Sequence, residues 1–417
     1  MTSTLELDLL APTTADAVIA NSRTVGPYLA GKADEIDGAR QLPDDVARVL
    51  RDAGLFRMAF PASRGGLEMS LEQQLGVVTR ISRVDASAGW NVGVLNATGM
   101  YAGRLGVDAY AELYPDADRP TSGSFHPRGR ADRVDGGWMV SGSWDWGSGS
   151  QSAHHVLGGC FAFEGGEPVI GASGKQLVLG AWLPPESIVF AHNWQTLGVR
   201  GSGSTSYSVP VPVFVPDAHT FDREAPDDGA KDPLNKSVHI AFFGLAGVAV
   251  GIAQHAVDLA VEAVRAKRGP RPAATLDSAT TQALGGILAD VDHLHAGVTA
   301  VARRTDEILF EAGRPLTGPQ LWRMISTQTT ATQVMRRVVQ TATDLVSARF
   351  LFDDHPMQRV VRDSYGAVAH VGGRAMMHGF LAQAVVDADG PGLLLDDLDA
   401  AGASAAAASG SAGSVLG

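Results

Sequence analysis

The spacing of apolar and polar residues predicts helices near the start of the chain. Between residues 42 and 50, apolar side chains recur three and four positions apart, and Pro43 stands in the first turn beside two acids. Gly54 ends this helix, and helical spacing resumes over residues 70–110. We therefore expect a helical domain over residues 1–115, with an open stretch before residue 42.

From about residue 120 the spacing changes to short segments rich in Val, Trp, Phe and Ser, separated by Gly and Pro. The clearest feature is a hairpin in which residues 131–134 and 138–142 flank the turn Asp135-Gly136-Gly137. These patterns predict a β-barrel or sandwich over residues 116–232. Further strands are expected at residues 155–163, 176–183, 187–193 and 207–215.

Helical spacing returns in the last third of the chain. Apolar stripes over residues 284–301 and 321–345 have the period of a helix-bundle core, so we expect a four-helix bundle over residues 233–400. The longest apolar run, residues 240–253, falls short of the roughly 18 to 20 residues of a membrane span and is interpreted as a buried helix. Residues 401–417 are almost entirely Ala, Ser and Gly, which predicts a disordered tail.

Composition and charge narrow the function. The chain has 33 Lys and Arg against 45 Asp and Glu, a net charge of -12 that disfavours binding to nucleic acid or to anionic membranes. The single cysteine, Cys160, can form no intrachain disulfide, and His293 and His295 stand two apart, on different faces of a helix, so no metal site is expected. The first residues lack the positive charge of a secretory signal, so a cytoplasmic protein is expected.

Several motifs of common enzyme classes are missing from the sequence. It has no G-x-S-x-G elbow, no Walker loop, no H-E-x-x-H pair and no strand-linked G-x-G-x-x-G. The glycine-rich piece at residues 200–204 lies between predicted strands rather than before a helix, so by itself it is a weak sign of phosphate binding.

Three local patterns carry a resemblance. They are VDGGWMVSGSWDWGSG at residues 134–149, LGVRGSGS at 197–204 followed by VFVP at 213–216, and PMQRVVRDSYGAVAH at 356–370. In this order, with helices before and after a β unit, they resemble the acyl-CoA dehydrogenase fold over about residues 40 to 380. They are more similar still to the flavin-dependent monooxygenases built on that fold, the oxygenase components of two-component systems. The fold class implied is α+β, mostly α.

The resemblance makes His370 the first candidate catalytic residue. Dehydrogenases of this fold carry a catalytic Glu shortly after the Arg-Asp pair, whereas this chain has His370 followed by Val371, Gly372 and Gly373. A carboxylate poised to abstract an α-proton is therefore missing. An imidazole that titrates near neutrality can deprotonate a phenol or orient a flavin hydroperoxide, which favours oxygenation. The alternative is a structural histidine inside a helix.

The same resemblance places Ser148 and Trp146 beside a flavin. The Ser148 hydroxyl would approach the flavin N5 and C4a atoms and shield a hydroperoxide from elimination. Trp146, two residues earlier on the same strand face, would pack against the isoalloxazine. The alternatives are an ordinary turn serine and a buried core tryptophan.

Other positions complete the implied site. Arg268, at a helix end, is similar to an arginine that holds the flavin in this family; the alternative is a solvated basic helix end. Ser347 and Arg349 lie in a later loop, which in the family contacts the flavin from a neighbouring subunit. Asn96 and Thr98 stand where many relatives carry a pocket histidine. His126 lies near the predicted pocket strands.

The resemblance implies a reaction and its participants. Reduced FMN or FAD would arrive from a separate NAD(P)H:flavin reductase and react with O2, and the hydroperoxide would hydroxylate an aromatic or polycyclic small molecule, with no metal. A homotetramer is implied. Oxygenation of an amine or amino sugar, an acyl-CoA dehydrogenase-like flavoprotein with an unusual base, and a non-enzymatic scaffold stay open as alternatives.

Overall fold

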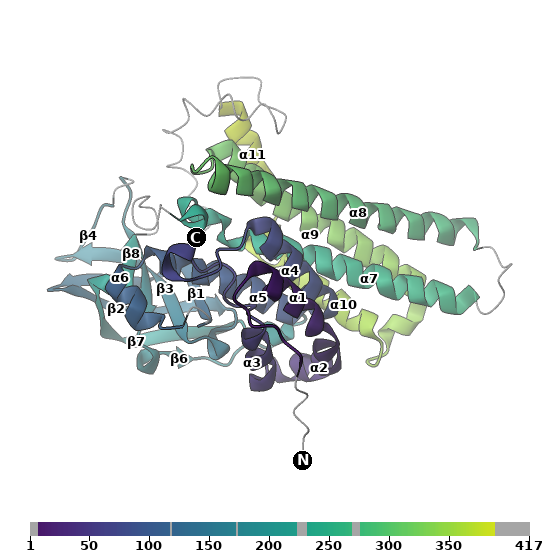
Figure 1. Ribbon diagram of the computed structural model, residues 1–417, viewed down its shortest axis with the longest axis horizontal. Coiled ribbons are helices and arrows are strands. Elements are labelled where there is room, and N and C mark those ends of the chain that lie inside the picture. Colours follow the sequence, from purple (N-terminus) through teal and green to yellow (C-terminus); the bar gives the residue numbers. More distant parts are fainter. Residues whose placement is uncertain (1–6, 117–118, 172–173, 223–231, 269–275, 388–417) are drawn as a thin grey trace, which may run out of the picture.

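The computed structural model describes residues 7–116, 119–171, 174–222, 232–268 and 276–387. A sheet occupies one end of the molecule and long helices extend toward the other (Figure 1). The expected tail at residues 401–417 lies outside the described residues. The N-terminal helices are α1 (Ala15–Thr24), α2 (Gly26–Ala39), α3 (Asp44–Asp52), α4 (Leu71–Val84), α5 (Ala86–Gly99) and α6 (Val107–Leu113). Helices α1 to α5 lie at the junction between the sheet and the long helices, and α6 lies beside the sheet (Figure 1).

The expectation of an open first stretch is wrong, because α1 and α2 fill it. Thr14 caps α1 by accepting a hydrogen bond from the Ala17 amide at 3.2 Å. Leu29 and Ile36 on α2 are fully buried. Three glycines and a proline within α2 obscure its helical period, and burial against the rest of the chain stabilises the helix instead.

The strands form one mixed sheet in the order β6-β7-β2-β1-β3-β5-β8, with β4 paired to β3. β1 and β3 are parallel, and the remaining pairs are antiparallel. The predicted hairpin is confirmed: β1 and β2 pair from Val134 and Gly137, and Gly136 has φ 75° in the turn. The strand bounds are β1 Thr121–Val134, β2 Gly137–Gly147, β3 His155–Glu164, β4 Glu167–Pro168, β5 Val178–Leu183, β6 Val189–Phe190, β7 Thr205–Pro216 and β8 Thr220–Asp222.

The sheet has an apolar core of its own, apart from the core shared by the helices. Trp144 of β2 is fully buried there, stacks on Tyr207 of β7 with ring centroids 5.4 Å apart, and donates its indole N–H to the Gly159 carbonyl at 2.8 Å. This packing fixes β2 against β7 at the end of β2, where Ser148 follows.

The C-terminal helices are α7 (Leu245–Arg268), α8 (Ser278–Asp306), α9 (Gly318–Val346), α10 (Pro356–Val368) and α11 (Met376–Asp387). Helices α7, α8 and α9 run alongside one another away from the sheet (Figure 1). Every residue of α5 is buried, because this helix is enclosed by α4, α7, α10 and β1. Helix α5 therefore reaches both the sheet and the bundle.

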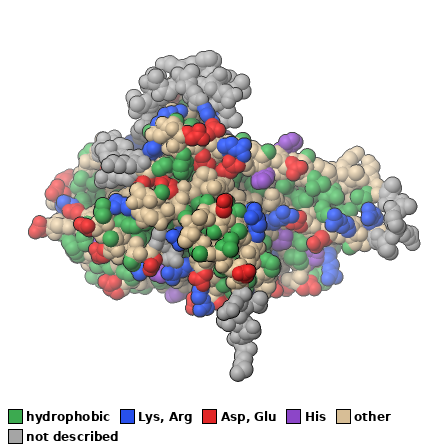
Figure 2. Space-filling view, in the orientation of Figure 1, with side chains coloured by type: hydrophobic (Ala, Val, Ile, Leu, Met, Phe, Trp, Pro, Cys, Tyr) green, Lys and Arg blue, Asp and Glu red, His purple; other side chains and the backbone are tan. Residues whose placement is uncertain are grey.

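Within the described residues, the segment His239–Arg268 is long and apolar enough to cross a membrane by length and composition. Its most apolar window is 82% buried inside the structure, as expected for a core helix. On the face shown in Figure 2, acidic and basic side chains of the described residues are dispersed rather than gathered by sign.

Candidate functional site

Three serine hydroxyls, here called the serine cluster, meet where β2 ends. The cluster consists of Ser148, Ser202 and Ser204, all buried. The Ser148 and Ser204 oxygens lie 2.7 Å apart, and so do the Ser202 and Ser204 oxygens. Trp90 of α5 donates its indole N–H to the Ser148 oxygen at 3.1 Å. Ser148 therefore joins the strand, the segment before β7, and α5.

The backbone around Ser148 is fixed as firmly as its hydroxyl. The Ser148 carbonyl accepts from the Ser122 hydroxyl at 2.7 Å, and the Gly149 amide donates to the Ser202 carbonyl at 2.9 Å. Gly149 has φ 69°, and a Cβ there would lie 2.6 Å from the Asn91 Oδ1 atom. Only glycine suits this turn, which brings the backbone beside Ser148 into direct contact with α5.

Trp90 also contacts His370, so the two predicted catalytic residues contact the same indole. The Trp90 and His370 rings meet edge to face, with centroids 6.0 Å apart and an interplanar angle of 73°. The turn after His370 is held to α9, because Thr329 donates to the Gly372 carbonyl at 2.8 Å. The structure thus links Ser148 and His370, although 222 positions of sequence separate them.

The protonation state of His370 differs from the expectation. Burial lowers its pKa to about 4, so the imidazole is neutral at pH 7 and does not titrate near neutrality. Its Nδ1 atom accepts from the Gly372 amide at 3.1 Å. A neutral imidazole whose Nδ1 accepts carries its proton on Nε2. His370 is therefore arranged to donate a hydrogen bond from Nε2.

Trp146 lies at the surface and is not a core residue. Its side chain is 65% exposed, and its ring meets Trp194 edge to face at 5.8 Å. Its backbone has φ 65°, a left-handed conformation that is uncommon for a bulky residue and is found most often at functional sites. An exposed indole that packs on the half-buried Trp194 thus stands two residues before Ser148.

The polar groups of Asn96 and Thr98 are engaged within the fold. The Asn96 side-chain nitrogen donates to the Leu55 and Val92 carbonyls at 2.5 and 2.7 Å, and its Oδ1 atom accepts from the Met58 backbone amide at 2.9 Å. Thr98 donates to the carbonyl one turn earlier in α5, at 2.8 Å. These bonds tie α5 to the segment before α4. His126 is exposed on β1.

Arg268, Ser347 and Arg349 lie together at the far end of the bundle. Lys267 donates to the Leu345 carbonyl at 2.5 Å, which brings the ends of α7 and α9 together. From Thr329, beside the His370 turn, to the end of α9 is about 25 Å of helix at 1.5 Å per residue. Arg268 and Arg349 are exposed, and Arg349 lies 3.8 Å from Asp354. Within one chain, these residues are separated from Ser148.

Sequence reasoning missed Trp90, which joins the two halves of this site. Because α5 is buried on all sides, its apolar residues show no one-sided stripe, and no motif marks an indole there. Among the described residues, no group of three His, Cys, Asp or Glu could hold a metal ion.

The arrangement of helices, sheet and helices is that of an acyl-CoA dehydrogenase-type protein. The family model for the acyl-CoA dehydrogenase N-terminal domain matches residues 22–112, and the model for the C-terminal domain matches residues 243–374. Together they match more than half of the chain, which therefore belongs to the acyl-CoA dehydrogenase family.

Curated relatives carry monooxygenase names. The chain is 31% identical over 209 residues, 50% of each protein, to the flavin-dependent monooxygenase, oxygenase subunit HsaA, from Mycobacterium tuberculosis, so it matches about half of the length of that relative. It is 28% identical over 353 residues to indole-3-acetate monooxygenase from Pseudomonas putida, covering 81% of this chain and 85% of the relative. Among solved structures, XiaF from Streptomyces sp., in complex with FADH2 and glycerol, superposes with a TM-score of 0.80 over 89% of this chain and 95% of that one. At 22% sequence identity, this likeness shows that the two proteins share a fold.

Proposed function

We propose that this protein is the oxygenase component of a two-component flavin-dependent monooxygenase that hydroxylates an aromatic small molecule. One observation carries the proposal: the Ser148 hydroxyl and the His370 imidazole both contact the Trp90 indole. A relative that aligns over most of its length acts, by its name, on indole-3-acetate, which supports an aromatic substrate. The proposed enzyme is cytoplasmic and takes reduced FMN or FAD from a separate NAD(P)H:flavin reductase.

The residues around Ser148 fit a planar cofactor with polar edges. Trp146 offers exposed aromatic surface and packs edge to face on the half-buried Trp194, and Ser148 follows two residues later in the chain. Trp146 would pack against the flavin ring, and Ser148 would hydrogen-bond its polar edge. When bound, the reduced flavin supplies the activation of O2. The protein supplies orientation and a site from which water is excluded.

The serine cluster leaves the Ser148 hydroxyl proton available for a hydrogen bond to the polar edge of the flavin. If Ser202 donates to Ser204 and Ser204 donates to Ser148, the Ser148 oxygen accepts from both Ser204 and Trp90. A hydroxyl that accepts two hydrogen bonds keeps its own proton for a further partner. Chains of hydroxyls polarise one another in the same direction, which strengthens the last donor.

His370 acts as a neutral hydrogen-bond donor in this proposal. Its Nδ1 atom accepts from Gly372, so the Nε2 proton is the group that can orient a reacting oxygen. Because the pKa is about 4, this form persists at neutral and alkaline pH. A dehydrogenase would need a carboxylate base at this place. The nearest acid on α10, Asp363, is buried and accepts from the Val199 amide instead.

Arg268, Ser347 and Arg349 complete the proposal through assembly. Their position about 25 Å along the bundle from the His370 turn, and the exposure of the two arginines, fit contacts with the flavin phosphate of a neighbouring copy. A homotetramer would bring the two groups of residues together. Light scattering of the purified protein would give the mass of four chains if this is right, and the mass of one chain would refute it.

The reaction is tested with a flavin reductase, NADH and isotopically labelled oxygen gas. A panel of aromatic acids that includes indole-3-acetate is incubated with the wild type, and the products are analysed by mass spectrometry. We expect one labelled oxygen atom in a hydroxylated product. Reduction of protein-bound oxidised flavin by an acyl thioester, with no labelled product from any aromatic acid, would instead identify a dehydrogenase.

A further inference from the structure

The segment Gly198–Ser204, which carries two members of the serine cluster, is held in a strained conformation. Val199 has φ 49°, a left-handed conformation that is costly for a β-branched residue. Its side chain is nevertheless buried, and its amide donates to the Asp363 Oδ1 atom at 2.6 Å. A short hydrogen bond from the Val199 amide to a buried carboxylate thus maintains a backbone that valine would otherwise avoid.

Helix α10 lies in direct backbone contact with this segment. A Cβ at Gly198 would lie 1.9 Å from the Arg362 carbonyl oxygen, and a Cβ at Gly366 would lie 2.5 Å from the Val199 Cγ2 atom. Both glycines therefore permit an approach that no other residue allows. Asp363, on the same helix, is placed by this approach within reach of the Val199 amide.

Hydrogen bonds continue from Val199 to the candidate catalytic serine. The Ser202 amide donates to the Val199 carbonyl at 3.1 Å, and Ser202 reaches Ser148 through Ser204 in two contacts of 2.7 Å each. In the other direction, α10 ends at Val368, two residues before His370. Asp363 therefore stands between the two halves of the site, although it contacts neither.

We propose that Asp363 is a positioning residue, whose hydrogen bond to the Val199 amide sets the place of the Ser148 hydroxyl relative to His370. This inference rests on the proposed function for its catalytic consequence. Its structural part stands on the contacts alone and is measurable in the protein without flavin.

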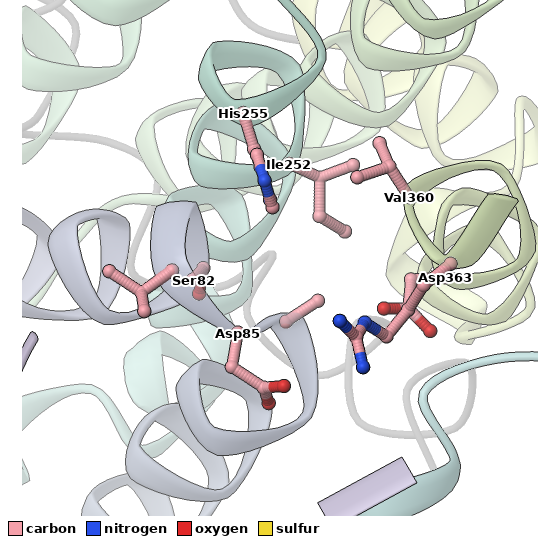
Figure 3. A pocket seen from close by; sticks show the side chains of 9 residues that line it. Ser82, Asp85, Ile252, His255, Val360 and Asp363 are labelled. Carbon is pink, nitrogen blue, oxygen red and sulfur yellow. The ribbon is translucent and has the colours of Figure 1, made fainter. Parts of the chain in front are cut away.

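The surroundings of Asp363 allow this role to be separated from simple folding. Asp363 and Asp85 project into one pocket from different elements, with Ser82 and His255 also lining it (Figure 3). A shortened side chain at position 363 therefore enlarges an existing pocket with partly polar lining and opens no new cavity in the apolar core.

A second attachment also limits the damage of a substitution. Asp37 on α2 accepts from Arg200 at 3.2 Å and from Arg362 at 3.1 Å. A variant without the carboxylate therefore keeps α10 beside the segment, and it loses only the direct bond to Val199.

Two substitutions at position 363 give the decisive comparison. Asp363→Ala removes the acceptor, whereas Asp363→Asn keeps an oxygen that can accept from the Val199 amide. Asp306→Ala is the matched control, since Asp306 is also an acidic acceptor of backbone amides, from Leu71 and Glu72, but on α8. Should Asp363→Ala fail to accumulate, Asp363→Val, which also lacks an acceptor, replaces it.

Hydrogen exchange followed by mass spectrometry is measured first, on the full chain without flavin. We expect exchange over residues 199–204 to be about tenfold faster in Asp363→Ala than in the wild type, and unchanged in Asp363→Asn and Asp306→Ala. Equal exchange over this segment in the wild type and Asp363→Ala would overturn the positioning role.

The catalytic part is then read as the fraction of reduced flavin that ends as hydrogen peroxide. Asp363→Ala should raise this fraction and Asp363→Asn should restore the wild-type value. If the wild type itself neither retains reduced flavin nor forms product, the proposed function fails. The hydrogen-exchange result still decides whether Asp363 positions the segment, because it is measured without flavin. A normal peroxide fraction in Asp363→Ala, with a working wild type, refutes the catalytic consequence.

Discussion

Replacing Ser148 with alanine removes the central member of the serine cluster. The Ser148 oxygen accepts from the Trp90 indole at 3.1 Å and lies 2.7 Å from the Ser204 oxygen, in a residue that is 6% exposed. A buried donor left without an acceptor costs about 1 to 3 kcal/mol, and a neutral hydrogen bond contributes about 0.5 to 1.5 kcal/mol. Ser204 retains Ser202 as a partner. We therefore expect the free energy of unfolding to fall by about 2 to 3 kcal/mol.

Ser204→Ala is the matched control for this substitution. It removes a hydroxyl from the same cluster but leaves the bond between Trp90 and Ser148 in place, so its cost should be roughly 1 kcal/mol. Urea unfolding at equilibrium, evaluated by linear extrapolation, measures both variants. Ser148→Ala should be the less stable of the two, because only this variant leaves the indole N–H without its acceptor.

A double-mutant cycle with Trp90→Phe completes the test. If the indole donates to Ser148, the cycle should give a coupling of about 1 kcal/mol between the two positions. A coupling near zero, or a Ser148→Ala variant as stable as Ser204→Ala, would refute this hydrogen bond and the link from Ser148 to His370 that depends on it.

Three further substitutions have expected outcomes. The pKa of His370 is about 4 in the folded protein, below the unfolded value near 6.5, so its contribution to stability is lost as the pH falls between these values. In urea unfolding, the free energy of unfolding of the wild type should therefore fall relative to that of His370→Asn between pH 7.5 and pH 5. A constant difference would contradict this. Burial raises the pKa of Asp363 to about 7, so the wild type should lose stability relative to Asp363→Asn as the pH rises from about 4.5 to 7.5. A difference in the free energy of unfolding that is the same at every pH would show that the carboxyl does not titrate in this range. Asp306→Ala leaves two amides at the start of α4 without acceptors and should lower the free energy of unfolding by about 1 to 2 kcal/mol; no loss would mean that water replaces the cap.

The sequence predicted the order of helices, sheet and helices, because long apolar stripes and a glycine turn are local signals. The hairpin around Gly136 and the helices over residues 284–301 and 321–345 follow from such signals. Helix α2 was not predicted, since its stability comes from packing against distant residues rather than from its own period.

The candidate site was predicted only in part, for a physical reason. Ser148 and His370 stand in recognisable motifs, but the contacts that join them come from Trp90, which lies far from both along the chain. The state of His370 was also beyond the sequence. Its pKa depends on burial, and its tautomer depends on the Gly372 amide, and both arise only when the chain is folded.

The most direct test of the proposed function is the rate at which oxidised flavin appears after the anaerobic complex of the wild type with reduced flavin is mixed with oxygenated buffer. The measurement is made by stopped flow, with free reduced flavin at the same concentration as the reference. A protein that activates oxygen in a site closed to water should delay the appearance of oxidised flavin and of hydrogen peroxide relative to free flavin. The same time course with and without protein would contradict the assignment of this chain as a flavin-dependent oxygenase.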